Sequence, residues 1–236
     1  MIDNLSDKFE ELKQGPFVSY GILAVSSIMY LILIFNGGSE NIYTLIEYGA
    51  KVNELIYLGE WWRLISPMFL HIGLAHFAFN SIIVYFLGME LEGLIGHFRF
   101  FILYLGSGVL GNLASFALNN SVSAGASTAI FGMFASTIVL GKLYPYHSGI
   151  QRLSRNYITL IALNVIFGLF SSSIDNAGHI GGLVGGYLLM YGLSSRNALN
   201  NPKKKRLVYA LAYLGVFILL YFIGYLKVSR FYSGLS

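Results

Sequence analysis

The stretch that decides the fold is Asn176–Gly186, which reads NAGHIGGLVGG. On a helix, its small residues form two adjacent stripes at four-residue spacing. The first stripe contains Gly178, Gly182 and Gly186, and the second contains Ala177, Gly181 and Gly185. Such stripes let helix backbones approach one another closely in a membrane. We therefore expect a packing seam inside a helical bundle, and we expect it to bring His179 against a partner helix.

The composition around this stretch is that of a membrane protein. Of 236 residues, 56% are hydrophobic and only 11% are charged, whereas soluble proteins carry about 25% charged residues. So few charges exclude an ordinary cytosolic enzyme and a disordered chain. The absence of cysteine excludes disulfides, cysteine-ligated metals and a cysteine nucleophile. The basic residues form no continuous face, so we expect no nucleic-acid partner.

Seven apolar runs predict seven transmembrane helices embedded in a lipid bilayer, since about 20 apolar residues cross a membrane. The runs lie near 17–35, 69–89, 98–117, 126–143, 156–172, 178–193 and 207–226. The fourth and sixth are rich in Gly and Ser, so hydropathy alone scores them weakly. We expect an all-α polytopic membrane protein with three parts. These are a short cytosolic segment at 1–16, a six-helix core at 17–193, and a basic linker with a seventh transmembrane helix at 194–236.

The distribution of Lys and Arg predicts the orientation of these spans. If the N-terminus is cytoplasmic, eleven of the fifteen Lys and Arg residues fall on the cytoplasmic side and four fall outside. The run Lys203–Arg206 is the strongest single anchor. Seven spans then place the C-terminus outside. The chain lacks the pattern of a transit peptide and its loops are short, which favours the plasma membrane of a bacterium.

The first outer loop, residues 36–68, has two interpretations. It contains Trp61, Trp62 and Arg63. In the first interpretation the tryptophans form an interfacial aromatic belt and Arg63 snorkels toward water. In the second, the loop is structured and lies partly in the outer leaflet.

Three spans place polar residues at similar depth in the outer half of the membrane. His76 and Asn80 share one face of the second span because they are four residues apart. Ser127 lies near the start of the fourth span, where its backbone N–H has no partner within the helix. His179 lies near the start of the sixth span, which runs in the same direction. A serine, a histidine as base and two further polar groups are the components of acyl transfer.

Other interpretations of these polar residues exist. They could be interhelical hydrogen bonds, or the solute site of a transporter, although the chain shows no convincing repeat. His71, His76 and His179 could bind a metal, although no carboxylate or thiolate lies in the same layer. Glu92 and Arg99 lie at the opposite end of the membrane, so we expect them to be structural, with the carboxylate holding a loop.

Taken in order, these residues resemble the rhomboid family of intramembrane serine proteases. The matching motifs are Trp-Arg in the first loop, His-x4-His-x3-Asn in the second span, the turn Gly-x3-Glu-x3-Gly, Gly-x-Ser at the fourth span and His-x2-Gly-x3-Gly at the sixth. They extend from Trp62 to Gly186. The resemblance implies a six-helix rhomboid core followed by a seventh helix. It also implies an active site that is open to water from the outer face.

The resemblance also implies a role for each polar residue. Ser127 and His179 would form a catalytic dyad, and His76, Asn80 and the Ser127 backbone N–H would form the oxyanion hole. The substrates would be transmembrane segments of other membrane proteins, cut near the outer face. We expect no metal and no cofactor. The alternative function is a proteolytically inactive rhomboid-like protein that binds membrane clients.

Two residues depart from the family pattern, and one invites a further role. Thr128 follows the serine where the family usually has Gly, and Phe131 stands where some members have Tyr. Neither change removes a catalytic atom. Asp175 precedes His179 by four residues, but the family pattern works without a third acid, and we do not assign it to a triad.

Overall fold

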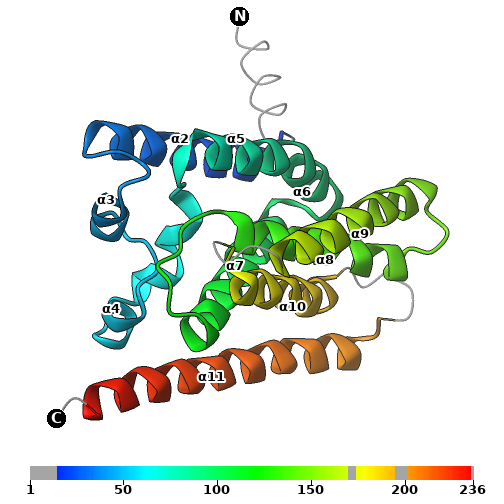
Figure 1. The fold of residues 1–236 in the computed structure, drawn as a ribbon. Coiled ribbons are helices and arrows are strands. Elements are labelled where there is room, and N and C mark those ends of the chain that lie inside the picture. Colours follow the sequence, from blue (N-terminus) through cyan, green and yellow to red (C-terminus); the bar gives the residue numbers. More distant parts are fainter. Residues whose placement is uncertain (1–14, 170–173, 195–200, 235–236) are drawn as a thin grey trace, which may run out of the picture.

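The computed structural model describes residues 15–169, 174–194 and 201–234. Long helices dominate it (Figure 1). They are α2 (Phe17–Phe35), α5 (Gly73–Ile83), which continues through the π-helical turn η3 (Val84–Gly88) into α6 (Met89–Ile95), α7 (His97–Leu118), α8 (Ser127–Leu143), α9 (Ser148–Leu169), α10 (Asn176–Leu193) and α11 (Lys203–Ser233). The predicted all-α fold of a multi-pass membrane protein is confirmed.

Four of these helical segments are long and apolar enough to cross a membrane: α2, the continuous α5–α6 segment, α7 and α11. The fourth predicted span, α8, is a shorter apolar helix. Its glycines and serines lower its hydropathy, as the sequence indicates. Because α8 and α10 pack against α7 in the interior of the bundle, they need less apolar surface than a helix that faces lipid.

The glycine stripes of α10 hold the centre of the bundle together. Gly182 and Gly186 face α8, where an added Cβ would overlap the carbonyl groups of Thr128 and Gly132. On the adjacent face, an added Cβ at Gly181 would lie 2.9 Å from the Leu110 carbonyl oxygen of α7. The prediction of a packing seam is confirmed, and each stripe serves a different partner helix. The consequence for the site is that α8 and α10 begin side by side.

The turn between α6 and α7 is held by a carboxylate. Glu92 is buried and accepts hydrogen bonds from the backbone N–H groups of Val18 and Ser19, at 2.9 Å and 2.8 Å, and from the Ser19 hydroxyl. His97 Nδ1 lies 2.6 Å from the same carboxylate. At Gly96 the chain adopts φ 84°, which favours glycine. The predicted structural role of Glu92 is confirmed, since it joins α2 to this turn.

The loop at 36–68 is structured. It contains the short helices α3 (Ile42–Glu47) and α4 (Asn53–Tyr57) and the 3-10 turns η1 (Trp61–Leu64) and η2 (Ser66–Phe69). Arg63 is buried, and its Nη1 donates to the carbonyls of Ile46 and Ala50, at 2.7 Å and 2.9 Å. The snorkelling interpretation is therefore wrong for Arg63, because the guanidinium closes the loop from within. Trp61 and Trp62 are exposed, as a belt requires.

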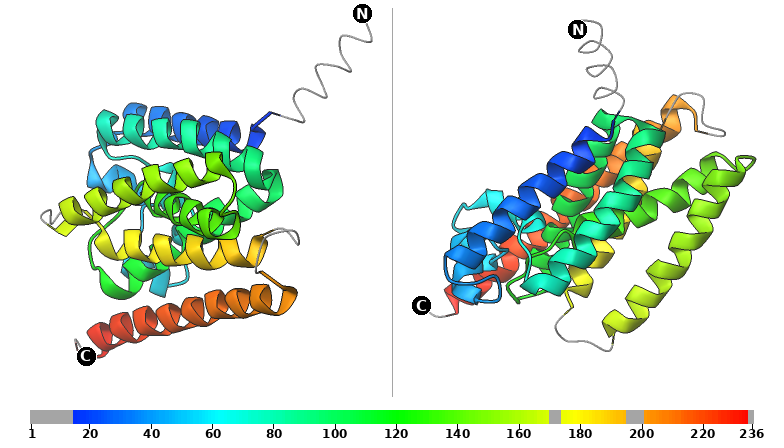
Figure 2. Two further views of the ribbon diagram at one scale, coloured as in Figure 1. Left: turned by 90° about the vertical axis from the view of Figure 1, so that its right-hand side faces the viewer. Right: turned by 90° about the horizontal axis from the view of Figure 1, so that it is seen from above.

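Two helices lie at the periphery, and their bounds correct the predicted ones. α9 packs mainly on α8 at one edge (Figure 2) and begins eight residues before the predicted 156. The charged Arg152 and Arg155 hide this first part from a hydropathy pattern. α11 lies along α10 and α7 on the side opposite α2 and α5 (Figures 1 and 2). Its 31 residues span about 46 Å, well beyond a hydrocarbon core of about 30 Å.

The three-part division of the chain stays a prediction. α10 ends at Leu193, where the predicted core ends, and α11 begins within the basic run. Residues 1–14 of the predicted N-terminal segment, and 170–172 of the predicted fifth span, lie outside the described residues.

Candidate active site

A cavity of about 570 Å³ lies where α5, α8 and the start of α10 meet the loop at 119–125. All four residues predicted for the site line it: His76, Asn80, Ser127 and His179. They come from three helices that are distant in sequence, and the structure brings them to one cavity. Loop residues 121–125 form another wall of the cavity.

Ser127 and His179 are in direct contact. The Ser127 hydroxyl lies 3.0 Å from Nε2 of His179. Ser127 is the first residue of α8, and Ala126 provides no side-chain cap, so the Ser127 N–H lies at the positive end of the helix. Phe131, one turn further along α8, stacks on the imidazole with ring centroids 4.1 Å apart and planes at 12°. The ring of Phe131 thus supplies the packing that fixes the orientation of the histidine.

Gly125 keeps the space between His76 and Ser127 open. Its φ is 143°, a conformation that favours glycine. A Cβ added there would lie 2.8 Å from His76 Nε2 and 3.7 Å from the Ser127 hydroxyl. The Gly125 N–H donates to the Pro67 carbonyl at 2.8 Å, which anchors the strained residue. Asn80 is buried, and its amide donates to the His76 carbonyl at 2.7 Å.

Thr128 fits its position because two glycines face it. Its side chain is buried at the junction of α7, α8 and α10. A Cβ added to Gly111 would lie 2.7 Å from Thr128 Cβ, and one added to Gly178 would lie 3.1 Å from its Cγ2. The missing side chains of these glycines therefore provide the room that a threonine needs. The departure from the family pattern leaves the contact between Ser127 and His179 intact.

Asp175 caps the helix that carries His179. Its carboxylate accepts from the Gly178 N–H at 3.0 Å, from the Asn119 amide at 2.9 Å, and from the Ser115 hydroxyl. Burial alone would raise the pKa of Asp175, but these hydrogen bonds outweigh it and hold the pKa below its usual value. The carboxylate therefore acts as a helix cap, and among the described residues its hydrogen-bond partners do not include His179.

Sequence reasoning missed Lys51 as part of this region. The charge distribution predicts it as one of the four basic residues outside the membrane, yet its side chain is fully buried. Burial lowers the pKa of Lys51 to about 8, although the nearby charge of Asp175 opposes this. A lysine two residues before an asparagine is the local signal in the sequence, and it does not distinguish Lys51 from the other charged residues of the loop. Its long-range partner, Asn119, is not visible in the sequence.

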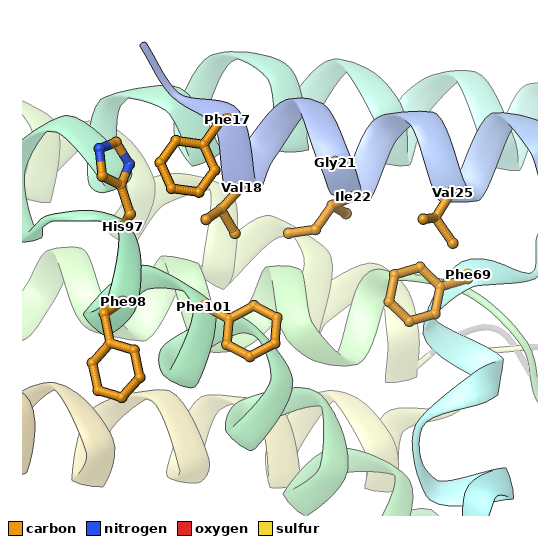
Figure 3. A pocket seen from close by; sticks show the side chains of 9 residues that line it. All are labelled: Phe17, Val18, Gly21, Ile22, Val25, Phe69, His97, Phe98 and Phe101. Atoms are coloured by element: carbon orange, nitrogen blue, oxygen red, sulfur yellow. The ribbon is translucent and has the colours of Figure 1, made fainter. Parts of the chain in front are cut away.

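A second hollow, of about 490 Å³, lies between α2 and α7 and contains no comparable chemistry (Figure 3). Its lining is apolar apart from His97, whose ring contacts Phe17. Within the described residues, no three His, Asp or Glu side chains are grouped as metal ligands would be. His71 is buried with its ring edge-on to His76, the ring centroids being 5.5 Å apart.

Comparison with known proteins gives one consistent result. Residues 58–196 match the family model described as the Rhomboid domain. The chain is similar to rhomboid protease GluP of Bacillus subtilis, with 43% identity over 172 residues, which cover 73% of this chain and 34% of that protein. It is also similar to the putative rhomboid protease YdcA of Bacillus subtilis, with 34% identity over 75% of this chain and 87% of that protein.

A third relative is rhomboid protease AarA of Providencia stuartii, with 32% identity over 71% of this chain and 68% of that protein. The matched part of this chain thus spans about a third of the length of GluP and larger shares of the other two.

Proposed function

We propose, since this chain belongs to the rhomboid family, that it is an intramembrane serine endopeptidase. Ser127 acts as the nucleophile and His179 as the general base. The observation that carries the proposal is the 3.0 Å contact between the Ser127 hydroxyl and His179 Nε2. It is the spacing that proton transfer between a nucleophile and its base requires. The stacked Phe131 holds the imidazole in line for this transfer.

The reaction proceeds in two balanced steps. The Ser127 oxygen attacks the carbonyl carbon of the scissile peptide, while its proton passes to His179 Nε2. The tetrahedral intermediate collapses as the C–N bond breaks, and His179 gives the proton to the departing amine. Water then attacks the acyl-enzyme, losing a proton to His179, and the Ser127 hydroxyl is regenerated as the new carboxyl product leaves.

Three donors suit the oxyanion of the tetrahedral intermediate. They are the Ser127 backbone N–H at the start of α8, the His76 ring and the Asn80 amide, and both side chains line the same cavity as Ser127. One N–H of the Asn80 amide is directed to the His76 carbonyl. The amide carries two N–H groups, so the second can serve the oxyanion. The loss of one such donor typically lowers the rate by about 10²–10³-fold.

The substrate in this proposal is a transmembrane segment of another membrane protein, and the cut falls near the outer face. Eleven of fifteen Lys and Arg residues favour the orientation in which the N-terminus is cytoplasmic, the C-terminus is outside and the cavity opens outward. A helix hides its carbonyl groups in hydrogen bonds. Segments that unwind readily, with Gly, Pro or polar residues, are therefore cut preferentially.

The test is cleavage of a single-pass substrate with a labile outer helix by purified protein in liposomes. We expect the parent protein to cleave it and Ser127→Ala to be inactive. Ser136→Ala is the matched control, because Ser136 lies on the same helix with its hydroxyl bonded to the Met133 carbonyl. Equal cleavage by parent and Ser127→Ala would refute the assignment of Ser127. Binding of membrane clients without any cleavage would favour the inactive alternative.

A further inference from the structure

Lys51 is a fully buried lysine outside the proposed dyad. It lies between α3 and α4, and the structure leaves none of its side chain accessible. Its Nζ donates to the Asn53 side chain at 3.0 Å and to the Asn119 carbonyl at 3.3 Å. Asn53 also donates to the Asn119 carbonyl, at 2.8 Å. A buried ammonium group is destabilising unless an opposite charge compensates it, so a partner charge is expected near Lys51.

The compensating charge is Asp175, and Asn119 joins the two. The Asn119 carbonyl accepts from Lys51, while its side-chain amide donates to the Asp175 carboxylate at 2.9 Å. Asp175 in turn caps α10, and its backbone carbonyl accepts the first helical hydrogen bond from the His179 N–H, at 3.0 Å. The lysine side chain is thus linked through Asn119 to Asp175, which caps the helix that carries His179.

The backbone of the same lysine is linked to the other half of the dyad. Lys51 and Ser123 form an isolated antiparallel bridge, with N–H to carbonyl distances of 2.9 Å and 3.2 Å. Ser123 lies two residues before the strained Gly125 and four before Ser127. Lys51 therefore contacts the segment that leads into Ser127 directly, and it reaches the segment that leads into His179 through Asn119.

We propose that Lys51 and Asp175 are positioning residues, which hold the nucleophile loop and the N-terminus of α10 in register so that Ser127 and His179 meet. The inference rests on the proposed function of the dyad. The loop at 36–68 thereby gains a specific role, in which its buried cation fixes the active-site geometry from outside the bundle. Neither residue touches the reacting atoms.

The test is the rate at which a fluorophosphonate labels Ser127, since labelling needs the dyad but no substrate docking. Lys51→Met leaves the charge of Asp175 uncompensated. Asp175→Asn leaves the charge of Lys51 uncompensated and weakens the cap of α10. We expect each to lower the labelling rate about tenfold to a hundredfold, because displacements near 1 Å have effects of this size. The double variant removes both charges. We expect it to label at least as fast as the slower single variant.

Lys227→Met is the matched control. It removes a neighbouring positive charge from α11 and leaves the hydrogen bonds among Lys51, Asn53, Asn119 and Asp175 intact. We expect its labelling rate to stay within about twofold of the parent near neutral pH. If a single variant does not yield folded protein, Asn53→Ala replaces it. This change removes contacts to Lys51 and to Asn119 while keeping both charges, and we expect a threefold to tenfold loss.

A pH profile separates positioning from a general loss of stability. The charged groups around Lys51 are Asp175 before α10, Lys227 on α11 and Glu54 on α4. As pH rises through about 8, Lys51 loses its proton, and Asp175 loses the positive charge that compensates it. The labelling rate of the parent should then fall, and that of the double variant should not.

Three results would overturn the proposal. In the first, folded single variants, or Asn53→Ala, label at the parent rate. In the second, the losses of the two single variants multiply fully in the double variant. In the third, the pH profile of the labelling rate is the same in the parent and the double variant. A failure of the proposed function is distinguishable, because the parent protein itself would then not be labelled at Ser127.

Discussion

Gly125→Ala should abolish most of the activity while leaving the protein folded. Gly125 has φ 143° and lies between His76 and the Ser127 hydroxyl. An alanine Cβ would lie 2.6 Å from His76 Cε1, whereas ordinary contacts begin at about 3.4 Å. The His76 ring would have to retreat by about 0.8 Å, or the backbone before Ser127 would have to change conformation.

The size of the effect follows from this displacement. A shift approaching 1 Å at a catalytic group lowers the rate about a hundredfold, and the loss of one oxyanion donor costs about 10²–10³-fold. We therefore expect kcat/KM to fall by about 10²-fold. The backbone strain of alanine at positive φ adds about 1–3 kcal/mol of destabilisation. This strain lowers the melting temperature but not the rate per folded molecule.

The assay is cleavage in liposomes at several substrate concentrations, with thermal unfolding measured on the same preparations. Gly38→Ala is the matched control, since Gly38 has φ 98° and an added Cβ there would meet no atom within 4 Å. It imposes similar strain far from the cavity, so it should lower stability without lowering kcat/KM. Activity of Gly125→Ala within about threefold of the parent would refute the reasoning about His76.

Substitutions at three further positions test the stacked ring, the turn before α7 and the first loop. Phe131→Ala should lower kcat about tenfold, because the freed His179 ring loses its alignment with Ser127, whereas Phe131→Tyr keeps the stacked ring and should stay near the parent rate. An unchanged rate in the alanine variant, measured by the same cleavage assay, would show that the stack is dispensable. Glu92→Gln should lower stability by about 2–4 kcal/mol, because charged hydrogen bonds are worth about 1.5–3 kcal/mol each; thermal unfolding checks this, and kcat at low temperature should stay at the parent value. Arg63→Lys should lower stability by about 2 kcal/mol through the loss of its fork of hydrogen bonds; an unchanged melting temperature would contradict its role in closing the loop.

Much of the bundle could be predicted because its decisive signals are local. The glycine stripes of α10 and the apolar runs are visible within single helices. The shared depth of Ser127 and His179 follows from the direction of two spans. The start of α9 was missed, because Arg152 and Arg155 belong to the helix but not to its apolar part. The π-helical turn at Val84–Gly88 has no sequence signature that distinguishes it from an α-helix.

The polar interior of the first loop could not be predicted, because its partners are distant in sequence. Arg63 carries the pattern of an interfacial residue, and only the folded loop shows that backbone carbonyls surround it. Lys51 contacts Asn119, which is 68 residues away. The carboxylate of Asp175 likewise accepts hydrogen bonds from Ser115 and Asn119, which lie at the end of α7. Composition and spacing cannot reveal such pairs.

The most direct test of the central claim is to map the fluorophosphonate adduct by tandem mass spectrometry on the purified protein. The proposed dyad predicts a single adduct on Ser127. It also predicts that the adduct is lost in His179→Gln and retained in His147→Gln, a histidine outside the cavity. An adduct on another serine, or one on Ser127 that forms equally fast without His179, would contradict the proposed dyad.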